Sequence, residues 1–246
     1  MAGQTLLVGL AHPDDEVGVA GTILAQVARG DRVVLVWLTR GEMTEAFGAR
    51  SADEVARIRE AHGQEAAEIL GCEVRFLDMA DAGVVASPEA ARRVARLICD
   101  VRPDGLLTWG DAWSRGMRHP DHQASGQIFR DAVTLARIAK VAAPDAPHRA
   151  PVPIFTLRGP HSTLPAVVVD VEPHLEQIHA LGRFYMREIG FGDAGWIERR
   201  LTAAASPYGL RYAEVHDAWE TVPGVVGALL PTTLAEDEPV HPDRAS

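Results

Sequence analysis

The stretch LLVGLAHPDDE, residues 6–16, joins a continuous apolar run to a histidine and a group of acidic side chains. An apolar run without alternation is typical of a strand that is buried on both faces of a parallel sheet. Pro13 favours an extended backbone at His12, so the strand ends there and a turn follows from its carboxyl end. Zinc accepts imidazole nitrogens and carboxylate oxygens as ligands. The stretch therefore predicts a buried strand that delivers His12, Asp14 and Asp15 to a metal site.

The rest of the first half alternates helix-like and strand-like segments. The segment 51–70 has helical periodicity, a capping box in which Ser51 stands three residues before Glu54, and Gly71 as a stop signal. Strands that alternate with helices indicate parallel strands joined by right-handed crossovers. The predicted helices are 16–29, 51–70 and 87–101, and the predicted strands are 6–11, 32–39, 73–77 and 105–109.

These elements predict an α/β fold, a three-layer αβα, Rossmann-like architecture with a mostly parallel sheet. In the strand order 3-2-1-4-5 of doubly wound sheets, strands 6–11 and 105–109 are neighbours, and ligands bind outside their carboxyl ends. A second cluster, His119-Pro120-Asp121-His122, follows strand 105–109 and begins another helix. We therefore expect the two clusters to form one metal site at the carboxyl ends of strands 1 and 4.

Each cluster also has a purely structural interpretation. Asp14, Asp15 and Glu16 are residues that suit the positive end of a helix dipole, and His-Pro-Asp-His is compatible with a helix cap that carries solvated histidines. His241-Pro242-Asp243 repeats the first three residues of the second cluster in a polar, charged tail, where we expect disorder. It is the pairing of two clusters, each after an apolar strand, that favours the metal site.

The composition argues against several classes of protein. The chain has 246 residues, a net charge of -10 and no basic stripe, so no nucleic-acid or membrane partner is indicated. Cys72 and Cys99 form no CxxC pattern, which leaves thiolate zinc without support. Lys140 is the single lysine, and phosphate-binding GxxxxGK[ST] and GxGxxG loops are missing, so Schiff-base chemistry and common nucleotide binding are disfavoured. The start of the chain has no charged leader and predicts a cytoplasmic protein.

With both clusters in place, the chain resembles the LmbE-like, or PIG-L, family of zinc-dependent N-deacetylases. The signature is AHPDDE after the first strand paired with HPDH after the fourth, and the resemblance covers residues 4–135. Weaker landmarks of the same family follow at 167–171 (VVVDV) and 212–215 (YAEV). We expect a single deacetylase domain over 1–231 and a mobile tail over 232–246, which is acidic and contains proline.

The resemblance implies a role for each member of the two clusters. It implies that three of them bind zinc: His12, Asp15 and His122. It also implies that Asp14 is the general base, that His119 stabilises the oxyanion, and that Asp121 orients His119. Three protein ligands leave an open coordination position, as a hydrolytic zinc requires. Two histidines and one aspartate also accept Fe2+ or another divalent metal.

The resemblance further suggests contacts with the substrate. Arg59 matches a family arginine that contacts sugar hydroxyls, although a surface salt bridge would explain such a residue equally well. Arg118 precedes HPDH and, with Trp113, is a candidate for the acceptor pocket, where an indole can stack on a sugar face. We expect His62 to be a solvated helix residue and His161 to be an ordinary loop residue.

The carboxyl-terminal third carries fewer signals. We predict helices over 173–189 and 195–205, a strand over 210–215, and a loop over 143–153. Trp109, at the end of the fourth strand, is expected to pack in the core.

The sequence thus predicts a zinc hydrolase that removes an acetyl group from the amine of an N-acetylglucosaminyl-type small molecule or glycoconjugate. Two other functions stay open. A metal-dependent phosphoesterase would need more clustered carboxylates and histidines, because such enzymes use two metals. A non-catalytic carbohydrate-binding module would be marked by damage to Asp14 or His119, and both are present. The oligomeric state also stays open, a homo-oligomer included.

Overall fold

A computed structural model of the chain describes residues 3–111, 119–159, 161–193, 195–220 and 224–230. Within these residues the strands form one sheet of eight strands, in the order β3-β2-β1-β4-β5-β7-β6-β8. The first five positions confirm the predicted order 3-2-1-4-5. The strands are β1 (Thr5–Leu10), β2 (Arg32–Trp37), β3 (Glu73–Phe76), β4 (Gly105–Trp109), β5 (Ile154–Leu157), β6 (Ala166–Asp170), β7 (Ala213–Ala218) and β8 (Gly224–Val226).

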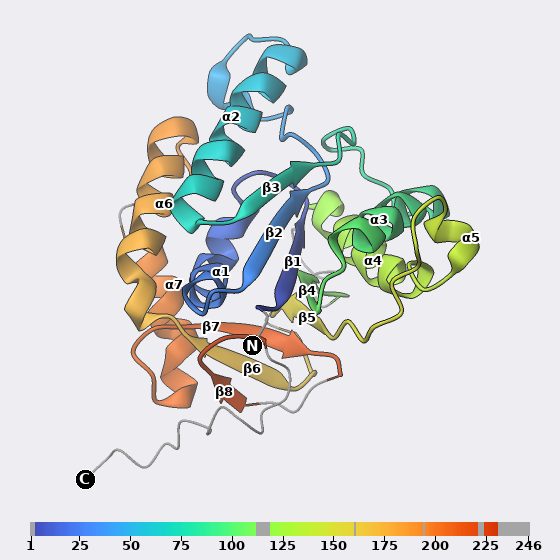
Figure 1. The fold of residues 1–246 in the computed structure, drawn as a ribbon. Coiled ribbons are helices and arrows are strands. Elements are labelled where there is room, and N and C mark those ends of the chain that lie inside the picture. Colours follow the sequence, from blue (N-terminus) through green and yellow to red (C-terminus); the bar gives the residue numbers. More distant parts are fainter. Residues whose placement is uncertain (1–2, 112–118, 160, 194, 221–223, 231–246) are drawn as a thin grey trace.

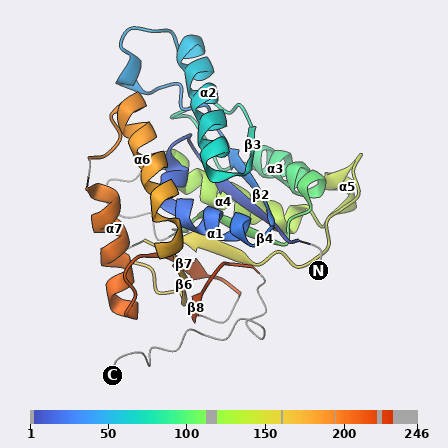
Figure 2. The ribbon, with the colours of Figure 1, turned by 60° about the vertical axis from the view of Figure 1, so that its left-hand side comes forward.

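Helices cover both faces of the sheet, as Figure 1 and Figure 2 show. The described helices are α1 (Ala20–Ala28), α2 (Ala52–Leu70), α3 (Pro88–Val101), α4 (Pro120–Leu135), α5 (Ala139–Ala142), α6 (Leu175–Ile189) and α7 (Trp196–Ala205). Helices α1, α2 and α6 contact one another, and α3 contacts α4 and α5. Strand β1 supplies a core on each face, because Leu6 and Val8 pack into one cluster and Leu7 into the other. The three-layer αβα architecture is therefore confirmed.

The pairing of the strands places the two sequence clusters at one edge. Strand β1 pairs in parallel with β2 and β4, β2 pairs in parallel with β3, and β4 with β5. The sheet becomes mixed beyond β5, because β7 is antiparallel to β5 and to β6. Since β1 and β4 are adjacent and parallel, the chain segments that follow Leu10 and Trp109 leave the sheet at the same edge.

Helix α2 forms as its sequence predicts. Ser51 Oγ accepts a hydrogen bond from the backbone N–H of Glu54 at 3.4 Å, and the Glu54 carboxylate accepts the N–H of Ser51 at 2.9 Å. These two bonds satisfy N–H groups that the helix itself leaves free. Gly71 ends the helix with φ of 70°, a conformation that glycine adopts without strain.

Other elements differ from the prediction. The helix predicted over 16–29 begins as a 3-10 turn, η1 (Asp15–Val19), because Asp14 has φ of 120° and the chain enters the turn outside helical geometry. The strand predicted over 210–215 is β7, which begins three residues later, after a bend. Strands β5, β6 and β8, of 4, 5 and 3 residues, were not predicted. The tail 232–246 lies outside the described residues, and the domain boundary at 231 stays a prediction.

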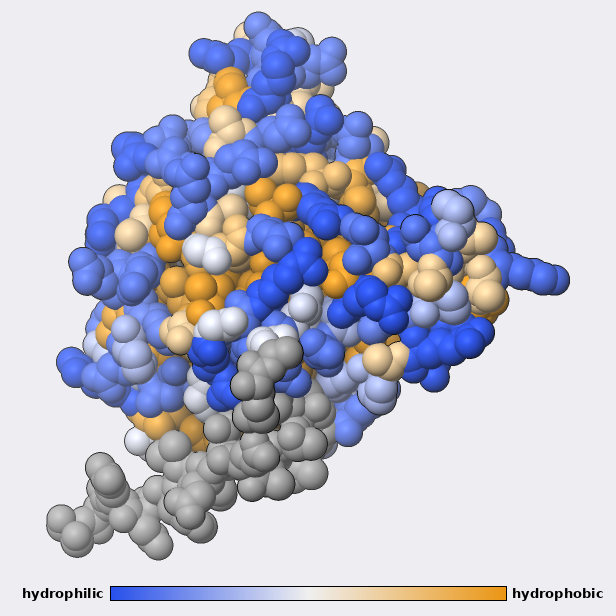
Figure 3. Space-filling view, in the orientation of Figure 1, coloured by the Kyte–Doolittle hydropathy of each residue, from blue (hydrophilic) through white to orange (hydrophobic). Residues whose placement is uncertain are grey.

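The described helices include none with the length and apolar character needed to cross a membrane. In the view of Figure 3, hydrophilic residues cover the projecting parts of the surface, whereas hydrophobic atoms show toward the middle of this face.

Gly9 offers a test of the packing between β1 and α4. A Cβ at this position would lie 2.4 Å from the ring of Phe129, so Gly9→Ala forces the ring or the strand to move. We expect this substitution to lower the free energy of unfolding by about 1–3 kcal/mol, measured by urea denaturation. Gly224→Ala is the control, because a Cβ there meets no described atom within 4 Å. Equal stability of the two variants would contradict the described packing.

Candidate metal centre and its cavity

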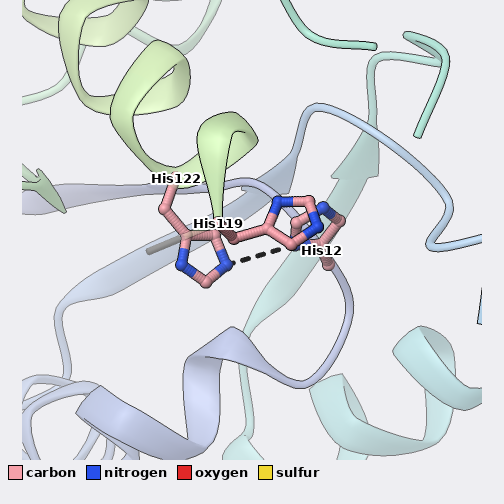
Figure 4. A group of neighbouring side chains, drawn as sticks. All are labelled: His12, His119 and His122. Carbon is pink, nitrogen blue, oxygen red and sulfur yellow. Dashed lines mark hydrogen bonds between the residues drawn. The ribbon is translucent and has the colours of Figure 1, made fainter. Parts of the chain in front are cut away.

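Three histidines from the two loops meet beside the ends of β1 and β4 (Figure 4). His12 follows β1, His119 is the N-cap of α4, and His122 lies in the first turn of α4. His12 Nδ1 lies 3.3 Å from His122 Nε2, although 110 positions separate the two residues in the sequence. The rings of His12 and His119 meet edge to face, with centroids 4.6 Å apart. The two sequence clusters therefore form one group of side chains.

Asp15 joins this group on the Nδ1 side of His12. Its Oδ1 lies 3.1 Å from His122 Nε2, and its Oδ2 lies 3.8 Å from His12 Nδ1. Asp15 Oδ2 also accepts hydrogen bonds from the backbone N–H groups of Ala11 and His12, each at 3.0 Å. These bonds hold the carboxylate so that Oδ1 faces His122. Ligand atoms about 3.3 Å apart suit a tetrahedral ion with bonds of about 2.0–2.2 Å.

Trp109, the last residue of β4, supports the same group. Its indole stacks on the His122 ring, with centroids 4.0 Å apart and planes inclined by 7°. Its Nε1 donates a hydrogen bond to Asp15 Oδ2 at 3.3 Å. Trp109 is 5% exposed, which confirms the predicted core position. The structure adds a positioning role for the indole that the sequence did not indicate.

The second nitrogen of His12 faces two further carboxylates. His12 Nε2 lies 3.1 Å from Asp81 Oδ1 and 3.2 Å from Asp121 Oδ2. The Asp121 carboxylate accepts two backbone N–H groups of the loop after β3, at 2.8 and 3.1 Å. Asp81 Oδ2 accepts the backbone N–H of Met43 at 2.8 Å. Both carboxylates are thus anchored by the backbone while they contact the imidazole.

The structure shows other contacts for Asp121 than the predicted one with His119. The Asp121 carboxylate contacts His12, and the backbone N–H of Asp121 donates to His119 Nδ1 at 3.3 Å. The start of α4 explains this difference, because the N-cap side chain accepts an N–H group that the helix leaves free. Asp81 was missed by sequence reasoning, since a single aspartate in the loop after β3 belongs to no recognisable motif.

The cluster favours positive charge at its centre. Burial opposes a charged imidazole, but hydrogen bonds with Asp121, Asp15 and Asp81 raise the pKa of His12 to about 12. Burial also opposes a charged carboxylate, yet hydrogen bonds with His12 and His122 hold the pKa of Asp15 below its usual range. Among the described residues, two groups have potential ligand atoms within 4.8 Å of one another, and the predicted ligand Asp15 belongs to neither. The groups are His12, His119 and His122, and His12, Asp81, His119 and Asp121. The structure therefore contains a candidate metal-binding cluster.

Asp14 lies beside the cluster in a strained turn. Its φ of 120° is rare for a residue other than glycine, and such strain is often found at functional sites. Arg59 Nη2, from α2, lies 2.6 Å from Asp14 Oδ2 and also donates to the carbonyl of Pro13. Burial raises the pKa of Asp14 to about 8, although the charge of Arg59 opposes this rise. The turn and Arg59 together fix the position of the carboxylate.

The predicted substrate residues have different outcomes. Arg59 is 1% exposed and pairs with Asp14, so the structure gives it a positioning contact, and its predicted sugar contact stays a prediction. Arg118 and Trp113 lie outside the described residues. His161 is exposed in its loop and does not line the cavity described below, in agreement with the expectation of an ordinary loop residue.

The prediction that His62 is solvated is wrong. His62 is 8% exposed, and its ring lies between Phe47 and Phe184, with centroid distances of 5.8 and 5.5 Å. The position is buried because α2 turns this face toward α6. Burial, followed by the charge of Arg59, lowers the pKa of His62.

A cavity of about 1340 Å³ extends from the cluster. Its polar end is lined by the three histidines together with Asp14, Asp15 and Arg59. Its other end is lined by α7, the 3-10 turn η5 (Ser206–Tyr208) and β7. This is the place where doubly wound sheets bind ligands, at the carboxyl ends of the strands.

A hydrogen-bond network ties α7 and β7 to the turn that carries Asp15. Arg200 of α7 donates to two backbone carbonyls of η1, at 2.7 and 2.9 Å. Glu214 of β7 accepts two N–H groups at the start of α1, at 3.1 and 2.8 Å, and lies 3.5 Å from Arg200. Thr22 Oγ1 donates to Glu214 at 2.8 Å and lies 2.7 Å from His216 Nε2. Helix α7 and strand β7 thus stabilise η1 and the start of α1, which follow the AHPDDE motif.

The protein has the predicted three-layer α/β fold, and the AHPDDE and HPDH motifs meet in one candidate metal-binding cluster. The sequence model of the PIG-L family, described as GlcNAc-PI de-N-acetylase, matches residues 7–133, just over half of the chain. The chain belongs to this family.

Relatives and a solved structure agree with this assignment. The diacetylchitobiose deacetylase of Thermococcus kodakarensis is 34% identical over 127 residues, 51% of this chain and 47% of that protein. The 1D-myo-inositol 2-acetamido-2-deoxy-alpha-D-glucopyranoside deacetylase 1 of Catenulispora acidiphila is 32% identical over 162 residues, 55% of this chain and 50% of that protein. The chain thus spans about half the length of these curated relatives. The N,N'-diacetylchitobiose deacetylase of Pyrococcus horikoshii has the same fold, with a TM-score of 0.78, 23% identity, and coverage of 88% of this chain and 84% of that one.

Asp81→Asn tests the support of His12. Asp81 uses one carboxylate oxygen for His12 Nε2 and the other for the backbone N–H of Met43. An asparagine has a single side-chain oxygen, so it can accept from only one of these two donors, and its NH2 group would face the other. Partners of this kind typically contribute about 10–100-fold to metal affinity, so we expect a loss of that size, measured by competition with a chelator. Asp78→Asn is the matched control, because its side chain is 62% exposed in the same loop. Equal affinity of the two variants would count against this role of Asp81.

His216 predicts a dependence of stability on pH. Burial, reinforced by the charge of Arg200, lowers the pKa of His216 to about 3. An unfolded histidine has a pKa of about 6.5, so between these values the unfolded state binds the additional proton and stability falls as the pH falls. The contribution of one group is at most about 1.4 kcal/mol per pH unit. We expect His216→Phe to remove it, measured as the free energy of unfolding between pH 4 and 7. Parallel curves for the two proteins would contradict this account.

Proposed function

We propose that the protein is a metal-dependent hydrolase that removes an acetyl group from the amine of an N-acetylglucosaminyl-type small molecule or glycoconjugate. The observation that carries the proposal is the convergence of His12, His122 and Asp15 beside Asp14, in one cavity of a PIG-L family fold. The names of the two relatives support it, since both describe deacetylases of acetylated amino sugars.

We propose that zinc is held on the Nδ1 side of His12, by His12 Nδ1, Asp15 Oδ1 and His122 Nε2. Two contacts among these atoms support this placement, because His122 Nε2 lies 3.3 Å from His12 Nδ1 and 3.1 Å from Asp15 Oδ1. On the opposite side, the carboxylates of Asp81 and Asp121 accept backbone N–H groups, so they suit the role of partners for the other ring nitrogen of His12. A bound zinc lowers the pKa of water and polarises a carbonyl, and Fe2+ is the alternative ion that this ligand set accepts.

Asp14 supplies the general base in this proposal. Its carboxylate, held by Arg59, accepts a proton as the oxygen of water attacks the amide carbon. The same proton is then donated to the amine nitrogen as the carbon–nitrogen bond breaks, which releases acetate and the free amine. The contact with Arg59 serves this transfer, because a general base must lie within hydrogen-bond reach of the proton that it accepts.

His119 is the proposed donor to the oxyanion. Its Nδ1 accepts a backbone N–H, so the proton of the neutral ring is on Nε2, which can donate a hydrogen bond. A neutral ring in this tautomer can donate a hydrogen bond to the oxyanion. Burial, with the neighbouring charge of His12, lowers the pKa of His119, in accordance with a neutral donor.

The test is the release of primary amine from a panel of N-acetylglucosamine derivatives by the zinc-loaded protein, its chelated form and Asp14→Asn. We expect chelation to abolish release and Asp14→Asn to lower kcat by about a hundredfold or more, while the variant still binds one zinc per chain. Asparagine is a suitable replacement because it tolerates positive φ better than most residues. Asp53→Asn, at an exposed position of α2, should behave as the unchanged protein.

Other results would favour the remaining functions. Two metals per chain with release of phosphate would favour a phosphoesterase, and sugar binding without any amine release would favour a binding module. The cytoplasmic location, the oligomeric state and the absence of nucleic-acid and membrane partners stay predictions.

A further inference from the structure

Part of the cavity lining, formed by α7, η5 and the loop before α7, is an apolar wall. Trp196 and Ala203 are seven residues apart in α7, a spacing that places both side chains on one face of the helix, and Pro207 lies in the turn η5 that follows. Phe191 packs edge-on against Trp196, with ring centroids 5.3 Å apart. The side chains from α7, η5 and the preceding loop that form this wall are Phe191, Trp196, Ala203, Ala204, Pro207 and Tyr208.

The charged side chains at this end of the cavity are already paired within the protein. The guanidinium of Arg200 bonds two carbonyls of η1, lies beside Glu214 and stands over the Trp196 ring, 5.7 Å from its centroid. Arg158 lies 2.5 Å from Asp217 and donates to the carbonyl of Leu164 at 2.9 Å. A ligand group beside this wall therefore meets apolar side chains, while the nearby charges keep their partners.

The size and the mouth of the cavity favour an apolar occupant. The volume of about 1340 Å³ exceeds the range of roughly 300–1,000 Å³ that is common for ligand pockets, so the cavity has room for more than an amino sugar. Two large hydrophobic side chains that line the cavity are exposed, Met43 by 61% and Phe191 by 38%. Exposed apolar surface at a cavity is characteristic of binding sites.

We propose that this wall binds an alkyl or aryl group carried by the amino-sugar substrate. The wall is continuous with the metal centre, so the group belongs to the same substrate molecule, as its aglycone or as its acyl chain. The inference rests on the proposed function and narrows its substrate class. Burial of one CH2 group changes an equilibrium by about fourfold, so an apolar chain on the wall should have a large effect on binding.

The experiment compares two series of substrates on the zinc-loaded enzyme. One series is the methyl, butyl and hexyl glycosides of N-acetylglucosamine, and the other is N-acetyl, N-butanoyl and N-hexanoyl glucosamine. We expect kcat/KM to rise by at least about tenfold from the shortest to the longest member of one series. A rise in the first series identifies the aglycone as the occupant, and a rise in the second identifies the acyl chain.

Substitutions at Ala203 test whether the apolar wall causes the higher kcat/KM expected for substrates with long chains. Ala203→Phe fills the space along α7, and Ala203→Asp places a charge there with little added volume. Both should reduce the ratio of kcat/KM between the longest and the shortest substrate to less than about threefold. Thr202→Phe is the matched control, because Thr202 is the neighbouring exposed residue and does not line the cavity, and it should leave the ratio unchanged.

A binding measurement separates this inference from the proposed function. The dissociation constants of methyl and hexyl glucoside, which have no amide, are measured by calorimetry for the same proteins. We expect hexyl glucoside to bind more tightly than methyl glucoside, and we expect the Ala203 variants to lose this difference. That result supports the apolar wall even where no substrate is hydrolysed. Equal values for short and long chains in both assays, or a preference that the Ala203 variants retain, would overturn the inference, whatever the hydrolytic activity.

Discussion

The imidazole of His12 stands between the carboxylate of Asp15 on one side and those of Asp81 and Asp121 on the other, and the geometry of the site depends on this arrangement. Asp15 and His122 lie on its Nδ1 side, and Asp81 and Asp121 on its Nε2 side. These residues come from the segments after β1, after β3 and at the start of α4, so one parallel sheet edge brings them together. Several carboxylates around one imidazole require positive charge for balance, and either a protonated ring or a bound cation can supply it.

The two ends of the cavity have opposite chemical character. At the polar end, Asp14 and Arg59 form a close pair beside the histidines, which suits a reaction that moves protons. At the other end, Arg200 and Glu214 turn their charges toward η1 and α1, so that they brace the reactive loop and leave the wall of α7 apolar. The same helix therefore stabilises the first loop and supplies a surface for a different part of the ligand.

The sequence predicted most of the first half, because its signals are local. The apolar runs before the AHPDDE and HPDH clusters, and the capping box at Ser51, each specify an element without knowledge of the rest of the fold. The predicted meeting of His12 with His122 followed from strand order alone. Asp81 could not be found in this way, since its contact with His12 depends on how the loop after β3 folds. The buried position of His62 was missed for the same reason, because the packing of α6 on α2 is not local.

The side of His12 on which the cation binds is the central claim, and anomalous diffraction at the zinc edge from zinc-loaded crystals tests it most directly. The account predicts one anomalous peak, about 2.0–2.2 Å from His12 Nδ1, Asp15 Oδ1 and His122 Nε2. A peak on the other side of the ring, bound by His12 Nε2 with Asp81 and Asp121, would contradict it.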